Sequence, residues 1–512
     1  MIPNREAFLR KAASIERWDI IVIGGGATGL GTALDAASRG YSTLLLESHD
    51  FGKGTSSKST KLIHGGVRYL RQGNVKMVMK ALRERGRLLK NAPHVVHPLQ
   101  FVVPCYKWWH KPWYGIGMKV YDALARSLGI GPSTFLNREE TLKLVPGLHS
   151  EGLRGAVTYW DGQFDDTRLL VSLAQTAVEK RAALLNYFPV TGLVESNGRI
   201  TGVEATDSET GTAYTFRARV VINATGIFTD SIRKMDDHGI KPMMQAAQGI
   251  HIVLEDSFLS QDTALMVPDT DDGRVVFGVP WHGKVLFGTT DTPLEQIENE
   301  PLARESEIDY LLEHASRYFS QAPKRKDILS VYAGLRPLVK ANKETKSISR
   351  DHTLIVSKKK LVTITGGKWT TYRQMAEDAV NRAEKTAKME KRVCLTRNLL
   401  LQDPHTFEYD ESEAGIQPSA SHRAESPLIH PELPYTEYDV RRAVSHEWAR
   451  TVEDVLARRT RSLFLNAEAA VQAATRTAEI MGQELDWTQE KRNQEVDRFA
   501  ETAKKYRVND DG

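Results

Sequence analysis

Three glycines near the N-terminus have the G-x-G-x-x-G spacing of a loop that can receive phosphate groups: Gly24, Gly26 and Gly29. They follow a β-branched apolar run over residues 18–23 and precede a helical pattern over 27–39. A turn without side chains lets the backbone approach a pyrophosphate, and the helix that follows directs unpaired N–H groups at it. Glu47 ends a second apolar run, where its carboxylate can accept hydrogen bonds from ribose hydroxyls. The pattern predicts a dinucleotide-binding βαβ unit rather than a purely structural turn.

Two further segments favour FAD over NAD, which the glycine motif alone does not distinguish. Residues 55–66 follow the second predicted strand and are rich in hydroxyl side chains and glycine, which suits contact with an extended dinucleotide. Residues 221–226 form an apolar run that ends in a turn of small residues and could pass under the adenosine half. The candidate cofactor-binding residues in these segments are Thr55, Ser56, Ser57, Lys61, His64, Gly65 and Gly226.

The composition indicates a globular protein whose redox chemistry needs a bound cofactor. The 512 residues suggest two or three domains, and a net charge of +4 is far below that of a typical nucleic-acid-binding chain. Only Cys105 and Cys394 occur, and they are far apart, so we expect neither a disulfide framework nor dithiol redox chemistry. We also expect no metal site, because His94 and His97 have no carboxylate or cysteine partner in view.

The remaining pattern predicts an α/β fold in three parts. Strand-like runs over residues 185–225 and 246–294 indicate a second, largely antiparallel sheet, and residues 402–434 contain five prolines typical of a linker. Apolar residues at helical spacing from Val440 to Leu456 predict an amphipathic helix opening a small C-terminal helical domain. We assign a Rossmann-like FAD-binding domain to 17–95, 150–240 and 340–390, an antiparallel-sheet substrate (cap) domain to 96–149 and 241–339, a linker to 391–434 and the helical domain to 435–512.

Several motifs resemble a single family. Residues 64–70 (HGGVRYL), 333–338 (AGLRPL) and 365–373 (TGGKWTTYR) closely resemble the FAD-dependent, respiratory glycerol-3-phosphate dehydrogenases. The same pattern is found at residues 288–291, 349–352, 452–461 and 464–467. The resemblance implies FAD as cofactor and the oxidation of sn-glycerol 3-phosphate to dihydroxyacetone phosphate by hydride transfer to the flavin. It also implies quinone as the electron acceptor.

The resemblance identifies a set of cations for the phosphate of the substrate. Arg336 and Lys368 are expected nearest to flavin and substrate, and Arg68, Tyr69 and Arg350 are expected to assist in binding the substrate. Several fixed cations suit a phosphate monoester, which is close to a dianion. In the same motifs, Gly367 and Thr370 join the cofactor-binding residues.

Three residues are the expected catalytic groups: Arg336, His251 and Lys368. His251 matches a family histidine near the substrate, and a near-neutral imidazole suits removal of the proton from an alcohol. A hydrogen-bonded histidine of the sheet remains the alternative. Because a guanidinium does not deprotonate in proteins, Arg336 is expected to polarise the alcohol oxygen and hold the phosphate. Lys368 precedes a helix predicted over 370–385, whose positive end could steady a reduced flavin.

Residues 106–114 (YKWWHKPWY) interleave tryptophan, tyrosine and lysine, a pattern that suits a membrane interface. The resembling enzymes are peripheral membrane proteins. A buried aromatic cluster or a subunit contact, for example in a homodimer, is the alternative. The sequence shows neither a signal peptide nor an apolar stretch that could span a bilayer. We therefore expect a cytoplasmic chain that rests on the inner face of the cytoplasmic membrane.

Two other functions remain open at this stage. An amine or amino-acid oxidase of the same fold needs one carboxylate-binding arginine and an apolar pocket, so a cluster of four cations argues against it. A flavoprotein that serves only as a binding module would not need His251, Arg336 and Lys368. The region between about residues 400 and 434 looks shorter than is usual for the resembling family, which keeps the binding-module alternative open.

Overall fold

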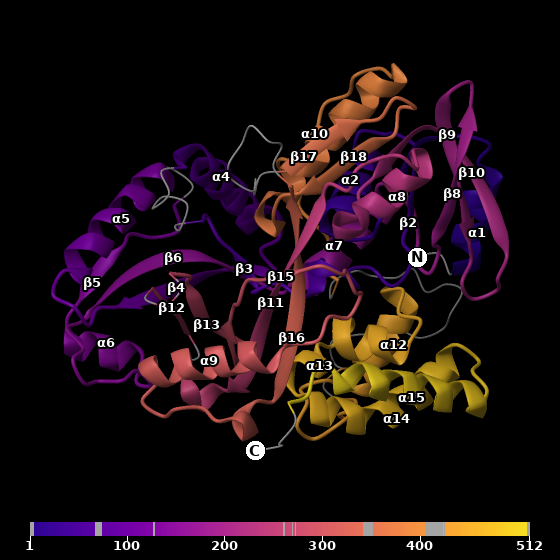
Figure 1. Cartoon of the computed structure of the whole chain (residues 1–512). Helices are drawn as coiled ribbons and strands as arrows, with labels where there is room; N and C mark the ends of the chain where they lie inside the picture. Colours follow the sequence, from indigo (N-terminus) through magenta and orange to yellow (C-terminus); the bar gives the residue numbers. More distant parts are fainter. Residues whose placement is uncertain are drawn as a thin grey trace.

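A mostly parallel sheet contains the N-terminal βαβ unit (Figure 1). The computed structural model describes residues 5–66, 74–125, 129–259, 262–268, 270–271, 273–340, 352–404, 423 and 425–508. The strand order is β17-β18-β10-β1-β2-β7, and the hairpin β8–β9 extends β10. The bounds are β1 Trp18–Ile23, β2 Thr43–Leu46, β7 Ala183–Leu185, β8 Val190–Ser196, β9 Arg199–Thr206, β10 Ala213–Asn223, β17 His352–Val356 and β18 Val362–Gly366. Because β1 lies between two parallel neighbours and is covered by helices, nearly all of its side chains are buried.

Helices cover this sheet and carry the predicted βαβ pattern. They are α1 Arg5–Ser14, α2 Ala27–Ser38, α7 Asp166–Glu179, α8 Thr229–Asp236 and α10 Tyr372–Ala387. Helix α2 contacts both α7 and α10. Gly31 allows the close approach to α10, because a Cβ atom there would lie 2.6 Å from the Tyr372 ring. The predicted strand–helix–strand unit is confirmed by β1, α2 and β2.

The second sheet is antiparallel except where β4 runs parallel to β12. Its order is β15-β11-β14-β13-β12-β4-β6-β3, with β16 paired to β11 and β5 paired to β6. The bounds are β3 Leu62–Ile63, β4 Val96–Pro104, β5 Thr134–Leu136, β6 Ala156–Phe164, β11 Met244–Glu255, β12 Thr263–Val267, β13 Val276–Trp281, β14 Lys284–Gly288, β15 Thr292–Leu294 and β16 Ser330–Val339. A second, largely antiparallel sheet is therefore confirmed for the strands over residues 246–294, but its predicted extension to residues 185–225 is wrong, because β8, β9 and β10 pair within the first sheet. Its long pair β11 and β16 places His251 opposite Tyr332 and Ala247 opposite Arg336.

Among the described residues, four further helices lie around the second sheet, and short 3₁₀ helices link several of the strands. The helices are α4 Val75–Asn91, α5 His110–Ala125, α6 Arg138–Leu144 and α9 Glu305–Tyr318. The 3₁₀ helices are η1 Thr55–Ser57, η3 Gly226–Phe228, η4 Asp256–Phe258, η5 Arg325–Asp327 and η6 Trp369–Thr371. Helix α5 lies at the edge of the molecule away from the C-terminal helices (Figure 1).

The C-terminal part is helical, as predicted, but the expected continuous helix from Val440 to Leu456 is wrong. It consists of α12 Glu437–His446, a π-helix η7 Asp454–Arg459, α13 Ser462–Leu465, α14 Ala467–Glu484 and α15 Gln489–Lys504. The chain leaves α12 after His446, and Trp448 takes a left-handed φ of +59°. The Asp454 carboxylate then accepts hydrogen bonds from the amides of Arg450 and Thr451, at 2.7 and 3.0 Å, which starts a separate helical turn.

The α/β fold class with a second sheet and a helical C-terminal part is confirmed. The predicted limits of the domains stay predictions. Strand pairing gives the membership of the sheets themselves: β3 and β6 fall in ranges assigned to the FAD-binding domain but pair within the second sheet. In the predicted linker, the Leu401 amide donates to the carbonyl of Asn91 at 2.7 Å, so this segment is bonded to the end of α4.

Candidate active site

The glycine turn between β1 and α2 has no room for side chains. Gly24 has a φ of +108°, and a Cβ atom there would lie 2.8 Å from the carbonyl oxygen of Ala224. A Cβ atom on Gly29 would lie 1.8 Å from the carbonyl oxygen of Gly24. The turn therefore sits tightly between the first turn of α2 and the end of β10. It leaves the N-terminal N–H groups of α2 directed at the site that a pyrophosphate would occupy.

The carboxylate of Glu47 is fixed beside this turn. One oxygen accepts a hydrogen bond from the Gly25 amide at 2.6 Å, and the other accepts one from the His49 amide at 2.9 Å. A half-buried carboxylate held at the end of a strand, next to a phosphate-binding turn, is suited to ribose hydroxyls. The predicted register of Glu47 with the glycine motif is thus present in the structure.

The hydroxyl-rich segment lies against the same turn. The Ser56 hydroxyl accepts a hydrogen bond from the Ala27 amide at 3.0 Å, at the first residue of α2. The carbonyl of Ser56 accepts one from the indole of Trp369 at 2.9 Å, and the Thr55 hydroxyl donates to the Leu335 carbonyl at 2.7 Å. These contacts bring the N-terminal turn, β16 and η6 together around one short segment.

The last two predicted cofactor segments meet at the end of β18. The Thr365 hydroxyl donates to the Gly226 carbonyl at 3.0 Å, and the Thr370 hydroxyl donates to the His64 carbonyl at 3.4 Å. Gly226 and Gly367 have φ values of +56° and +73°, a conformation that favours glycine. These contacts bring backbone and hydroxyl groups of the predicted cofactor segments together, and Glu47 lies beside the glycine turn that belongs to the same set. These residues fit FAD, whose adenosine, pyrophosphate and flavin need such a chain of small and polar contacts.

His251 lies on β11 with its ring buried. Its Nε2 atom is 3.0 Å from the Thr60 hydroxyl, and the ring stacks on Tyr332 with centroids 4.9 Å apart. Burial, followed by the positive charges of Lys61 and Arg336, holds the pKa of His251 well below its usual range. The imidazole is therefore neutral near pH 7, which is the protonation state that a base requires.

Arg336 is held in one orientation on β16, opposite β11. One guanidinium nitrogen donates to the Asp291 carboxylate at 2.9 Å and to the Gln248 carbonyl at 3.2 Å. The other donates to the Thr290 carbonyl at 2.8 Å and to the Thr289 hydroxyl at 3.2 Å. Because Ala247 stands opposite Arg336 and His251 follows four residues later on β11, the cation and the imidazole come from one strand pair.

The structure describes two other basic residues of the predicted site, Lys368 and Lys61. Lys368 lies directly after Gly367, at the start of η6, with its ammonium nitrogen buried. Lys61, predicted to bind the cofactor, is fully buried and donates to Asp166 and to the Ser57 carbonyl at 2.6 and 2.8 Å. Its ammonium thus serves to hold the chain. The remaining substrate-binding predictions lie outside the described residues: Arg68, Tyr69 and Arg350.

Three neighbours of the site were not singled out from the sequence: Thr60, Asp291 and Tyr332. Thr60 belongs to the hydroxyl-rich segment, and Asp291 closes the motif over residues 288–291, so both had a local signal. Tyr332 directly precedes the motif over 333–338, but its place beside His251 depends on the register of two strands. That register is not visible in either strand alone.

Two families match the chain. Residues 19–373 match the model "FAD dependent oxidoreductase", and residues 413–492 match "C-terminal domain of alpha-glycerophosphate oxidase". The mitochondrial glycerol-3-phosphate dehydrogenase of Macaca fascicularis is 40% identical, over 98% of this chain and 75% of that protein. Its counterpart in Arabidopsis thaliana is 38% identical, over 98% of this chain and 89% of that protein. The chain belongs to the FAD-dependent glycerol-3-phosphate dehydrogenases.

Solved structures agree with this family and with its cofactor. The glycerol-3-phosphate dehydrogenase from Bacillus halodurans, complexed with FAD, has a TM-score of 0.76 at 28% identity and covers 98% of this chain and 97% of its own. A glycine oxidase from Geobacillus kaustophilus shares the fold alone, with a TM-score of 0.54 at 18% identity, over 75% of this chain and 99% of its own. FAD is the cofactor of this chain, as predicted.

Other parts of the described chain show neither a metal cluster nor a membrane-spanning helix. Within the described ranges, no three histidine, cysteine or acidic side chains gather closely enough to hold a metal ion. The Nε2 atom of His94 lies 2.9 Å from the Ser172 hydroxyl. No helix among the described residues is long and apolar enough to cross a bilayer.

Proposed function

We propose that this glycerol-3-phosphate dehydrogenase oxidises sn-glycerol 3-phosphate to dihydroxyacetone phosphate and passes the electrons to a membrane quinone. The observation that carries the chemistry is a neutral, buried His251 on the strand pair that also fixes Arg336. FAD, when bound, accepts the hydride from the carbon that bears the secondary alcohol. The chain must therefore remove the hydroxyl proton and bind a dianion.

The residues divide this work by charge. His251 accepts the hydroxyl proton, since its imidazole is neutral and has an unprotonated ring nitrogen to receive it. Arg336 and Lys368 bind the alcohol oxygen and the phosphate. The Asp291 carboxylate keeps the Arg336 guanidinium in one plane, so that its position is set before the substrate arrives. Arg68, Tyr69 and Arg350 complete the substrate site in this proposal.

An anaerobic titration tests the chemistry. The purified yellow protein is mixed with sn-glycerol 3-phosphate, and the flavin absorbance is followed, with glycerol, glycine and sarcosine as controls. We expect bleaching by the phosphate ester alone, together with formation of one dihydroxyacetone phosphate per flavin. Bleaching by glycine or sarcosine would instead make the protein an amine oxidase. An unbleached flavin in every case would leave a binding module.

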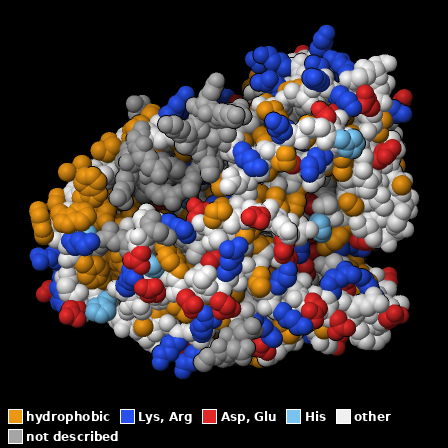
Figure 2. Space-filling model, in the orientation of Figure 1, with side chains coloured by type: hydrophobic (Ala, Val, Ile, Leu, Met, Phe, Trp, Pro, Cys, Tyr) orange, Lys and Arg blue, Asp and Glu red, His pale blue; other side chains and the backbone are white. Residues whose placement is uncertain are grey.

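A face of α5 supports the membrane part of the proposal. Apolar side chains gather at the edge of the molecule where α5 lies (Figures 1 and 2). We call this surface the α5 patch, and its exposed members are Trp108, Trp109, Trp113, Ile116, Val120 and Phe135. Trp108 and Ile116 are 78% and 68% exposed, which is far from the burial expected of an aromatic core cluster. The opposite face of α5 is buried through Met118, Tyr121 and Ala125.

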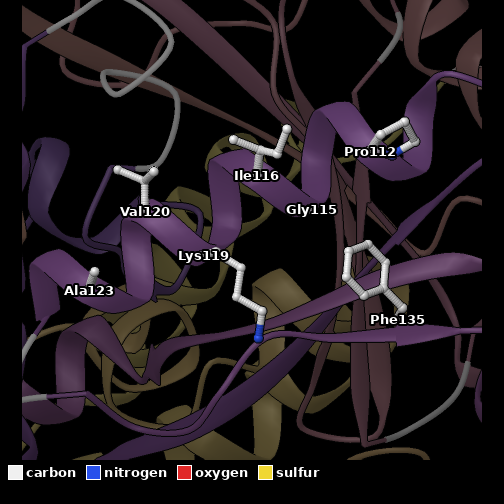
Figure 3. Close-up of a pocket in the computed structure, with 7 residues that line it drawn as sticks. All are labelled: Pro112, Gly115, Ile116, Lys119, Val120, Ala123 and Phe135. Carbon is white, nitrogen blue, oxygen red and sulfur yellow. The ribbon is translucent and has the colours of Figure 1, made fainter.

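The α5 patch also has the shape and flanking charge of a membrane-binding surface. Ile116 and Val120 point the same way from the helix, whereas Lys119 points to the other side (Figure 3). A shallow hollow of about 400 Å³ lies among Pro112, Ile116, Val120 and Phe135. The Lys107 ammonium lies 5.6 Å from the Trp109 ring, at the end of the patch. Indole rings and lysine together suit the headgroup region of an anionic bilayer, where quinone is dissolved.

A triple substitution tests the patch. Replacement of Trp113, Ile116 and Val120 by serine should abolish sedimentation with vesicles that contain an anionic lipid. It should also abolish reduction of a long-chain quinone in those vesicles, while reduction of a soluble short-chain quinone stays unchanged. The matched control replaces Val393 and Leu400 by serine. Both side chains are strongly exposed outside the α5 patch, so this variant should still bind the vesicles.

The location on the inner face of the cytoplasmic membrane is part of this proposal. The alternative use of the α5 patch is as a subunit contact, and the oligomeric state of the protein in solution distinguishes it from membrane binding. A wild-type dimer that becomes monomeric in the triple variant, with vesicle binding unchanged, would make the α5 patch a subunit contact.

A further inference from the structure

We propose that Arg461, in the C-terminal helical part, is a positioning residue for the reaction because it fixes the segment that orients His251. The inference rests on the proposed role of His251 as the base. Among the described residues, none of the predicted cofactor, substrate or catalytic residues lies in the C-terminal part. Arg461 therefore gives it a function in catalysis that can be measured separately from folding.

Arg461 reaches from the C-terminal helices into the FAD-binding part of the chain. It is 1% exposed, and its φ of +61° is a left-handed conformation that a side-chain-bearing residue keeps only when its contacts stabilise it. Its guanidinium donates to the Ser57 carbonyl at 2.9 Å and to the Ala457 carbonyl at 2.8 Å. The ring of Phe464 lies 4.0 Å from the guanidinium carbon.

Asp166, the first residue of α7, binds three side chains beside the Ser57 carbonyl. Its carboxylate pairs with Arg461 at 3.2 Å and with Lys61 at 2.6 Å, and it accepts a hydrogen bond from the Ser59 hydroxyl at 2.7 Å. Arg461 and Lys61 also share the Ser57 carbonyl as an acceptor. The segment from Ser57 to Lys61 is thus held from one side by buried ionic contacts.

The other side of the segment faces His251. Between Ser59 and Lys61 stands Thr60, whose hydroxyl lies 3.0 Å from His251 Nε2. The Tyr332 hydroxyl donates to the Ser59 carbonyl at 2.9 Å, and the Tyr332 ring stacks on the imidazole with an interplanar angle of 14°. The two contacts that orient the imidazole therefore come from Thr60, which lies within this segment, and from Tyr332, which is bonded to it through the Ser59 carbonyl.

Phe464 continues this connection from the C-terminal part. Its ring lies 4.8 Å from the Tyr332 ring, which also contacts His251. The Ser330 hydroxyl donates to the Leu463 carbonyl at 3.0 Å, so α13 is bonded to the strand that carries Tyr332. A shift of α13 thus reaches His251 through a ring stack as well as through the segment around Thr60.

Arg461 also sets the charge beside His251. Burial, followed by the positive charge of Arg461, lowers the pKa of Lys61 to about 7, against the opposing effect of Asp166 and Asp165. Asp165 itself lies 3.0 Å from His282. Loss of Arg461 would let Lys61 keep its proton to higher pH, so a pH dependence that follows Lys61 should move to higher pH.

Arg461→Met tests the inference, with Arg442→Met as the matched control. Arg442 is similarly buried in the C-terminal part and pairs with Glu447, which Arg168 also holds. Both holoenzymes are compared by amide hydrogen exchange and by anaerobic reduction with sn-glycerol 3-phosphate. We expect faster exchange over residues 57–63 only in Arg461→Met.

In Arg461→Met the rate of flavin reduction at saturating substrate should also fall by roughly tenfold or more, because a small displacement of a catalytic group greatly slows the reaction. Its substrate dissociation constant should stay within a few-fold, and its pH profile should move to higher pH. Arg461→Lys, which keeps the charge, should restore most of the rate. Wild-type exchange, rate and pH profile in Arg461→Met would overturn the inference.

Two further outcomes remain separable. If Arg461→Met does not fold, Phe464→Leu replaces it: slower reduction at an unchanged substrate dissociation constant supports the inference, and a wild-type rate contradicts it. If wild-type protein is not reduced by sn-glycerol 3-phosphate at all, the proposed function fails, whereas the exchange experiment still shows whether Arg461 holds the segment.

Discussion

Gly29 gives the most direct test of the cofactor site. Replacement of Gly29 by alanine adds one methyl group, and that carbon would lie 1.8 Å from the carbonyl oxygen of Gly24. Carbon atoms of this kind stay at least 3.0 Å from such neighbours, so the two backbones must separate by about 1.2 Å. Gly24 cannot easily retreat, because its own Cβ position is already 2.8 Å from the Ala224 carbonyl oxygen.

The separation predicts a loss of FAD affinity that can be estimated. A shift of this size breaks hydrogen bonds between the turn and a bound pyrophosphate. Two charge-assisted bonds at about 1.5–3 kcal/mol each amount to about 3–6 kcal/mol. That corresponds to a dissociation constant raised by roughly 10²–10⁴-fold. The variant should therefore purify without its yellow colour.

Gly31→Ala is the matched control, because it makes the same substitution in the same helix. Its added carbon would meet the Tyr372 ring at 2.6 Å, so it disturbs the contact with α10 and leaves the turn intact. Fluorescence titration of both apoproteins with FAD, together with thermal denaturation, measures the two effects. We expect both variants to melt earlier and only Gly29→Ala to lose FAD. Wild-type affinity in Gly29→Ala would refute the reasoning.

Three further predictions concern single side chains. Arg336→Lys cannot reproduce the forked contacts to Asp291 and the neighbouring carbonyls, so flavin should stay bound while its reduction slows by about 10²-fold in stopped-flow measurements; a wild-type rate would show that a single charge suffices. His251→Asn should slow reduction by roughly 10²–10⁴-fold with little change in substrate dissociation constant, and an unchanged rate would return His251 to a structural role. Burial, and then the charge of Arg442, lowers the pKa of His446 from 6.5 to about 4. The folded protein therefore binds a proton at His446 less readily than the unfolded chain. The contribution of His446 to the free energy of unfolding is fully present above pH 6.5 and is lost as the pH falls toward 4. Between pH 7 and pH 5 the loss is up to about 2 kcal/mol in the free energy of unfolding, and His446→Asn should remove it from urea titrations; an equally steep fall in the variant would assign the pH dependence to other groups.

The sequence predicted those elements of the fold that are marked by the spacing of apolar residues or by turn residues within one short segment. The strand over residues 18–23, the helix from residue 27 and the glycine turn between them follow from periodicity and from the steric needs of a phosphate-binding loop. The helix expected from residue 370 begins two residues later, at Tyr372, after the 3₁₀ turn η6. Helix ends depend on local capping contacts, and such an offset is small.

The prediction of a continuous helix from Val440 to Leu456 was wrong because the spacing of apolar residues does not change where one helix ends and the next begins. Val440 and Val444 lie on α12, whereas Val455 and Leu456 lie on η7. Both elements bury the same kind of side chain against one core, so the spacing stays helical across the break. The local marker of the break is the pair Thr451 and Asp454: the Thr451 hydroxyl accepts a hydrogen bond from the Asp454 amide, and the Asp454 carboxylate accepts one from the Thr451 amide.

The assembly of the site could not be predicted, since it depends on contacts between distant segments. Trp369 donates to the carbonyl of Ser56 across 313 residues, and Arg461 donates to that of Ser57 across 404. No local pattern specifies either partner. The family motifs pointed to separate segments, and the strand register of β11 and β16 places His251 and Arg336 on one strand pair.

The segment over residues 55–61 illustrates why similar side chains along one segment serve different purposes. Its hydroxyl and basic groups suggested uniform contact with a cofactor. In the structure, the Ser56 hydroxyl lies at the N-terminus of α2, the Thr60 hydroxyl lies at His251, and Lys61 turns into the interior with a left-handed φ of +61°. Burial of the Lys61 ammonium is tolerable because Asp166 and the Ser57 carbonyl accept hydrogen bonds from it. The same pairing draws in Arg461, so cofactor site, base and C-terminal helices depend on a single short turn of chain.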